Sequence, residues 1–127
     1  MLDTHIWIWW ASQSRTLATS HRQFIEQHVA EGLGVSVISC WEVGKLVEKG
    51  RLKLNTTVWH WVDTALSLPG VELLPLTPRI AIESSQLPAP IHGDPADQIL
   101  VATARILAIP LMTADQRLID YPHVVTL

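Results

Sequence analysis

The sequence is poor in cysteine, in long apolar runs and in net positive charge, and each shortage excludes a class of protein. A single cysteine, Cys40, is present, so no internal disulfide can form and a disulfide-stapled fold is excluded. The apolar opening MLDTHIWIWW contains Asp3 and His5 and has no basic segment before it, which argues against a secretory signal. This stretch also falls short of the ~20 residues needed to cross a bilayer. We therefore expect a cytoplasmic protein with no membrane segment.

Positive charge is scarce overall, with a formal net charge of −3. This argues against the broad basic surface that nucleic-acid-binding proteins usually show. The distribution of charge matters more than the net charge. If five of the twelve acids share one site, seven acids remain on the rest of the chain, against nine Lys and Arg residues. A modestly basic surface around an acidic, cation-binding pocket is compatible with RNA. The five acids are Asp3, Glu42, Asp94, Asp97 and Asp115.

Nothing in the sequence divides the chain. There is no repeat, low-complexity run or linker, so we expect a single domain over residues 1–127. Strand-like and helix-like segments alternate, which is typical of an α/β fold with a mostly parallel sheet. The predicted strands are residues 2–9, 34–38, 71–76, 111–113 and 124–126, and the predicted helices are residues 20–31, 39–49, 58–68, 78–86, 95–108 and 116–119.

Acidic residues lie at the junctions between these segments. Asp3 belongs to the first strand segment, and Glu42 follows the second strand. Asp97 begins a late helix, and Asp115 follows the fourth strand. Ligands of parallel α/β sheets collect at the carboxyl ends of the strands, so one cleft could gather these side chains. Clustered carboxylates raise one another's pKa unless they share a cation, and oxygen ligands suit Mg²⁺ or Mn²⁺.

Each acid also has a purely structural explanation. Ser39 and Glu42 fit a helix capping box, in which the glutamate returns to the start of its own helix. Asp94 fits a helix N-cap, and Asp97 is an acid favoured by the helix dipole in a first turn. Asp3 and Asp115 could likewise cap the segments that follow them. Spacing alone leaves both interpretations open for every one of these residues.

The sequence around the acids is more specific than their spacing, because it resembles the PIN-domain family and, within that family, the VapC toxins of toxin–antitoxin operons. The similar segments cover nearly the whole chain and occur in the family's order. They are LDTHIWIWW at 2–10, VSVISCWEVGKLVEKGRLKL at 35–54, PLTPRIAIESSQLP at 75–88, HGDPADQILVATARILAIPLMTAD at 92–115, and the following QRLIDYP.

The resemblance implies a three-layer α/β/α sandwich with a central, mostly parallel sheet of about five strands. It also implies a metal-dependent endoribonuclease that uses Mg²⁺ or Mn²⁺, forms a homodimer and is inhibited by a small cognate antitoxin. Matching positions identify the catalytic and metal-binding acids as Asp3 in LDTH, Glu42 in WE, Asp97 in DQILVATA and Asp115 in TAD. Thr113 matches the hydroxyl position before the last aspartate, where it would orient a carboxylate or a metal-bound water.

The chain departs from the family in two places. Only Met1 and Leu2 precede Asp3, so we expect a weak first strand that continues through Ile6 to compensate. Gln98 stands where this branch often has Arg, which removes a positive charge from the cleft edge. The main alternative function is an inactive PIN module that only binds its antitoxin or RNA. A haloacid-dehalogenase-type phosphohydrolase is disfavoured, because such enzymes need a second aspartate where this chain has a histidine.

Other residues near the acids allow two interpretations. The six tryptophans favour core and dimer contacts over base stacking. His5 and His92 flank the predicted acids and could contact a carboxylate or a phosphate. A basic run around the end of the Glu42 helix is either a solvated face or an edge that follows an RNA backbone. The run consists of Lys45, Lys49, Arg51 and Lys53.

Overall fold

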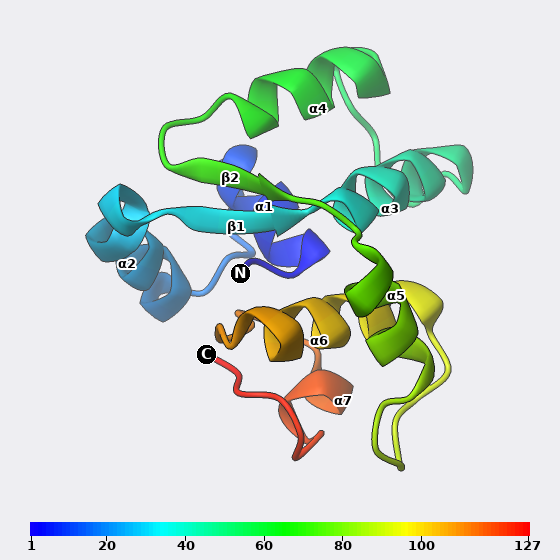
Figure 1. The fold of residues 1–127 in the computed structure, drawn as a ribbon. Helices are drawn as coiled ribbons and strands as arrows, with labels where there is room; N and C mark the ends of the chain where they lie inside the picture. Colours follow the sequence, from blue (N-terminus) through cyan, green and yellow to red (C-terminus); the bar gives the residue numbers. More distant parts are fainter.

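The computed structural model describes residues 1–127 and contains a short parallel sheet surrounded by helices (Figure 1). The two strands are β1 (Leu33–Ser36) and β2 (Val71–Leu74), which pair in parallel. The helices are α1 (Thr4–Ala11), α2 (Thr19–His28), the short 3₁₀ helix η1 (Val29–Glu31), α3 (Val37–Glu48), α4 (Val58–Leu66), α5 (Pro78–Ser85), α6 (Pro95–Leu107) and α7 (Gln116–Ile119).

Three more extended segments continue the parallel order beyond β1 through single bridges. Leu2 bridges Val35 of β1 on one side and Met112 on the other, and Leu111 bridges Thr126. The predicted α/β fold with a parallel sheet is therefore confirmed. The expected number of strands is not, because only two segments are long enough to pair as strands.

Helices cover both faces of these extended segments. Leu2 and Met112 belong to one hydrophobic cluster, which also holds buried residues of α1, α2, α3 and α4. Leu111 belongs to a second cluster with residues of α6 and α7. Neighbouring residues of an extended chain point to opposite faces, so Leu111 and Met112 bury their side chains in different layers.

The prediction of a strand over residues 2–9, continuing through Ile6, is wrong. Helix α1 begins at Thr4, and the amide of Trp7 donates to the carbonyl oxygen of Asp3 at 2.9 Å. The segment is rich in residues of high β propensity, but the side chains of Ile6 and Trp7 are fully buried in the first cluster. The gain from packing these side chains outweighs the small propensity differences that favour a strand.

The capping-box explanation for Ser39 and Glu42 is also wrong. The hydroxyl oxygen of Ser36 accepts a hydrogen bond from the amide of Ile38 at 3.2 Å, so α3 begins at Val37. Both Ser39 and Glu42 therefore lie inside the helix, where their side chains are free to make contacts with other elements. Strand β1 ends where the cap begins, two residues before the predicted end of the strand.

Helix α6 begins as predicted. A carboxylate oxygen of Asp94 accepts from the amide of Asp97 at 3.0 Å, and Pro95 occupies the first helical position. The other predicted helices all form, with ends that differ by at most a few residues. The longest helix has 13 residues, and no helix combines the length and hydropathy that a membrane crossing requires.

Candidate active site

The predicted acids lie where extended segments give way to helices. Asp3 follows the bridged residue Leu2 and is the N-cap of α1. Asp115 is the N-cap of α7, just beyond the bridged segment that contains Met112. Glu42 lies in the second turn of α3, directly after β1. Because the extended segments are parallel, their carboxyl ends and these side chains meet at one edge.

A threonine links two of the acids across 110 residues of sequence. The hydroxyl of Thr113 donates to Oδ2 of Asp3 at 2.6 Å. The same hydroxyl oxygen accepts from the amide of Asp115 at 3.0 Å. Thr113 is 1% exposed and Asp3 is 5% exposed, so this contact is shielded from water. This hydrogen bond puts Thr113 in contact with the Asp3 carboxylate, as the first of its two expected roles requires.

A second hydroxyl chain holds Glu42. The hydroxyl of Thr4 donates to Oε1 of Glu42 at 2.6 Å. The hydroxyls of Thr4 and Ser39 are 2.8 Å apart. Because a threonine hydroxyl carries one hydrogen and Thr4 gives it to the glutamate, Ser39 donates to Thr4. Helices α1 and α3 thus fix one oxygen of the Glu42 carboxylate through two buried side chains.

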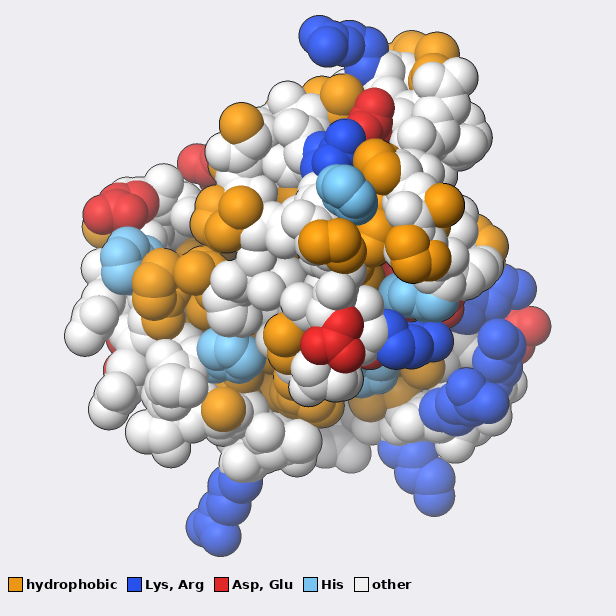
Figure 2. Space-filling view, turned by 90° about the horizontal axis from the view of Figure 1, so that it is seen from below, with side chains coloured by type: hydrophobic (Ala, Val, Ile, Leu, Met, Phe, Trp, Pro, Cys, Tyr) orange, Lys and Arg blue, Asp and Glu red, His pale blue; other side chains and the backbone are white.

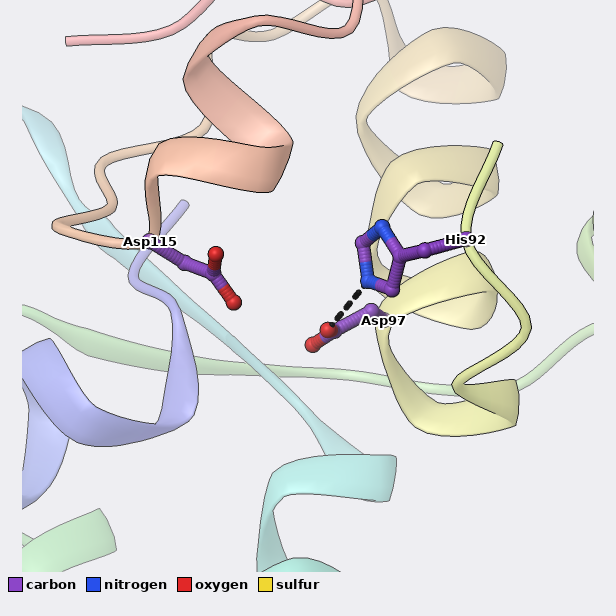
Figure 3. A group of neighbouring side chains, drawn as sticks. All are labelled: His92, Asp97 and Asp115. Carbon is purple, nitrogen blue, oxygen red and sulfur yellow. Dashed lines mark hydrogen bonds and ion pairs between the residues drawn. The ribbon is translucent and has the colours of Figure 1, made fainter. Parts of the chain in front are cut away.

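Asp97 projects from the first turn of α6 toward Asp115 and contacts His92 (Figure 3). The Nε2 atom of His92 is 2.7 Å from Oδ2 of Asp97, which makes a hydrogen bond from the imidazole to the carboxylate. His92 lies in the loop before α6, and its backbone carbonyl accepts from the side-chain amide of Gln98 at 3.0 Å. The position of the imidazole is therefore set from the same helix that presents Asp97.

Arg117 brings a positive charge to the edge of the cluster. Its Nη2 atom is 2.8 Å from Oδ2 of Asp115 and 3.6 Å from Oδ2 of Asp97. The Nε atom donates to the other oxygen of Asp115 at 3.2 Å. The Arg117 side chain is 59% exposed, so it spans from the cluster to solvent.

Burial and mutual repulsion raise the pKa of three of these carboxyls. Burial raises the pKa of Asp3 and of Asp97, although the hydrogen bonds from Thr113 and His92 work in the opposite direction. Burial raises the pKa of Glu42 to about 7, and the charges of Asp97 and Asp3 add to the rise. A nearby cation therefore stabilises the folded protein when these carboxyls are ionised.

Asp115 differs from the other acids because it has a permanent counter-ion. Its hydrogen bonds with the Arg117 guanidinium lower the pKa of the Asp115 carboxyl. In return, Asp115 raises the pKa of Arg117. Asp115 is therefore ionised across the physiological pH range, whereas Glu42 titrates within it.

Two sets of side chains bring their ligand atoms close enough to share a metal ion. In the first set the atoms of His92, Asp97 and Asp115 lie within 4.8 Å of one another, and in the second set those of Glu42, Asp94 and Asp97 do so. Asp97 belongs to both sets. Asp3 belongs to neither, but its charge acts on the pKa of both Glu42 and Asp97.

Comparison with known proteins identifies the class to which this arrangement belongs. The family model for the PIN domain matches residues 1–124. The chain therefore belongs to the PIN-domain family. It is 33% identical over 123 residues to Ribonuclease VapC22 of Mycobacterium tuberculosis (strain ATCC 25618 / H37Rv), a match that covers 97% of this chain and 92% of that protein.

Three solved structures share the fold. The crystal structure of VapBC2 from Rickettsia felis bound to a promoter DNA fragment gives a TM-score of 0.74 at 18% identity and covers 100% of this chain and 96% of that one. DNA-bound VapBC from Salmonella typhimurium gives 0.69 at 17% identity, with 100% and 95% covered. A toxin–antitoxin complex from Klebsiella pneumoniae gives 0.67 at 21% identity, with 98% and 94% covered.

Three polar residues of the cluster were not predicted from the sequence. Thr4 and Ser39 look like ordinary helix residues, and their contact with Glu42 depends on how α1 and α3 pack. Arg117 could have been found, because it follows Asp115 by two residues at a helix start, within reach of its carboxylate. His5 and His92 were both expected to flank the acids. His92 contacts Asp97, and His5 lies near enough to Asp3 to lower the pKa of that carboxyl, with its ring 5.8 Å from that of Trp9.

Proposed function

We propose that this chain is a metal-dependent endoribonuclease and the toxin component of a type II toxin–antitoxin pair. The observation that carries the proposal is the convergence of carboxylates from separate chain segments, three of them with raised pKa values. The 33% identity to a protein named as a ribonuclease supports RNA as the substrate. Because such a substrate is cellular RNA, we place the protein in the cytoplasm.

The donor atoms fit Mg²⁺ or Mn²⁺. They are carboxylate oxygens with one imidazole nitrogen, and hard divalent cations prefer oxygen ligands. Asp3, Glu42, Asp97 and Asp115 are the proposed ligands, acting directly or through water. A bound cation would polarise the phosphodiester and activate a water for hydrolysis. Both Mg²⁺ and Mn²⁺ suit this set of donor atoms.

The chain's own residues would prepare this chemistry. Thr113 holds the Asp3 carboxylate in one orientation, and Thr4 does the same for Glu42. His92 holds Asp97. Carboxylates that are held in place before the substrate arrives lose less conformational freedom on binding. Hydrogen bonds to metal-binding carboxylates also tune the affinity for the metal. Catalytic roles are proposed for the four acids, with Thr113 as the residue that positions Asp3.

The direct test is cleavage of labelled single-stranded RNA by the purified chain with Mg²⁺, with Mn²⁺ and with a chelator. We expect cleavage only with a divalent cation. Asp97→Asn keeps the shape of the side chain and should abolish cleavage while the protein stays folded. Arg15→Gln provides a control for the loss of a surface cation away from the cluster. Metal binding without cleavage by the native chain would instead favour the inactive PIN module.

The partner we propose is a small cognate antitoxin, encoded by a neighbouring reading frame. It would inhibit by placing an Arg or Lys against the carboxylates or by covering the site. Co-expression with that reading frame should relieve toxicity of the native chain. An unchanged growth defect would contradict the pairing.

We also propose that the chain forms a homodimer. Large apolar side chains stand in solvent, with Trp59 85% exposed, Ile82 58% exposed and Leu73 50% exposed. Trp59 lines an apolar hollow with Val58 and Val62 of α4 and Val37 of α3, and an exposed apolar patch is typical of contacts between proteins. Light scattering should give twice the mass of one chain, and a monomer at high concentration would contradict the proposal.

A further inference from the structure

A hollow of 230 Å³ opens beside the carboxylate cluster, along one side of α3. It shares Glu42 and Asp94 with the cluster, so the two sites are continuous. Away from the acids, its wall is formed by Trp41 and the basic residues that follow along α3 and beyond its end. These basic residues are Lys45, Lys49 and Arg51.

Two cations of this wall are free to bind an anion. Lys49 and Arg51 are exposed, and neither has a carboxylate within ion-pair distance. Lys45, by contrast, pairs with Glu48 at 3.2 Å. Figure 2 shows several Lys and Arg side chains gathered at the right edge of the face it presents. The outer end of the hollow is therefore positive, and its inner end is acidic.

An aromatic ring also lines this hollow. Trp41 is 54% exposed although it immediately precedes the half-buried Glu42 in α3. The Lys45 ammonium lies 5.7 Å from the centre of the Trp41 ring, a cation–π contact that holds the indole in place. A large apolar ring kept at the surface of a hollow that also presents carboxylates and unpaired cations is suited to stacking on a flat group.

We propose that this hollow binds one nucleotide of single-stranded RNA next to the phosphate that is cleaved. The base stacks on Trp41, and the backbone phosphates contact Lys49 and Arg51. The inference rests on the proposed ribonuclease function and adds a substrate subsite to it. A hollow of 230 Å³ admits a base or a phosphate but not a duplex, so the bound strand is single. Phosphate contacts position the strand, and stacking tolerates any base, so this subsite fixes register more than sequence.

The test measures binding of a fluorescein-labelled single-stranded RNA to the Asp97→Asn chain, which leaves the RNA intact. Adding Trp41→Ala should weaken binding about tenfold, and Trp41→Phe should keep most of the affinity because the ring can still stack. Adding Lys49→Gln and Arg51→Gln should lower the slope of log affinity against log salt by about 0.7 for each lost phosphate contact.

Matched controls lie away from the hollow. Arg15→Gln removes an exposed cation that lines a different hollow beside α1 and α2, and Phe24→Ala removes an exposed aromatic ring from α2. Neither should change affinity or salt slope. Thermal melts of every variant show whether a lost affinity reflects lost folding, and rescue by Trp41→Phe identifies stacking as the cause.

The outcomes separate this inference from the proposed function. If the native chain cleaves RNA but the hollow variants bind and cleave like their parents, the subsite is wrong and the ribonuclease stands. If the variants lose only the binding of the co-expressed antitoxin, the hollow is a protein-docking site and the inference is overturned. If the native chain cleaves no RNA with either metal, both proposals fail.

Discussion

At the scale of one residue, Arg117 offsets part of the negative charge of the carboxylate cluster when no metal is bound. Its guanidinium contacts Asp115 and lies 3.6 Å from Asp97, two carboxylates that also belong to one set of possible metal ligands. A cation in this position competes with a divalent ion for the same negative charge. The side chain is exposed, so it can swing into solvent when the ion binds.

We therefore predict that Arg117→Gln raises the affinity of the protein for Mg²⁺ a few-fold. Isothermal titration calorimetry at low salt measures this directly. Lys53→Gln, with the same change of charge away from the cluster, should leave the affinity unchanged. A weaker affinity in the Arg117 variant would mean that the guanidinium instead holds Asp115 in its ligating position.

Thr113 supports a second prediction. Thr113→Val has nearly the same shape but removes the hydrogen bond to Asp3, whose buried carboxylate then loses its partner. Leaving a buried polar group unpaired costs about 1–3 kcal/mol. Urea unfolding of the metal-free protein should show a loss of stability in that range, and RNA cleavage should fall. Thr113→Ser keeps the hydroxyl and should keep most of the stability and most of the cleavage activity. Equal losses in the Val and Ser variants would contradict the role of the hydrogen bond.

At the scale of elements, the junctions between strand and helix decide how much could be predicted. The helix that begins at Pro95 was predictable because Asp94 and Pro95 form a local start signal. The first strand was mispredicted because burial of Ile6 and Trp7 depends on the distant residues around them. The acids could be assigned by their resemblance to a family, whereas the hydroxyls of Thr4 and Ser39 act across packed helices and leave no local pattern.

Asp94 combines two roles at the start of α6, and a pair of substitutions separates them. Its carboxylate caps the helix through the amide of Asp97 and also lies within reach of a metal shared with Glu42. Asp94→Ala removes the cap and should cost about 1 kcal/mol of stability. Asp94→Asn keeps a capping oxygen, so stability should hold while Mg²⁺ affinity falls a few-fold. Unchanged affinity in the Asn variant would show that Asp94 is a cap only.

At the scale of the whole molecule, the cluster makes folding depend on pH. Burial raises the pKa of Asp3, Glu42 and Asp97 in the folded chain above their ordinary values. The folded state therefore binds protons more tightly than the unfolded state does. For Glu42 the contribution is fully present below its ordinary pKa of 4.5 and is lost as the pH rises through about 7. Asp115 has the opposite sign, but its lowered pKa places its effect in more acidic solution.

The metal-free protein should thus be more stable at pH 5 than at pH 8. The part due to Glu42 should be about 2 kcal/mol, since a pKa unit corresponds to about 1.4 kcal/mol and solvent screens this partly exposed group. Denaturant unfolding in chelator across this range measures the slope, and Glu42→Gln should flatten it because a neutral amide does not titrate. Mg²⁺ should restore stability at pH 8 in the native chain and much less in the Gln variant, since the ion offsets the same repulsion that the proton does. If the stability of the native chain instead rises steadily from pH 5 to pH 8 without metal, the ionised carboxylates do not destabilise the folded state.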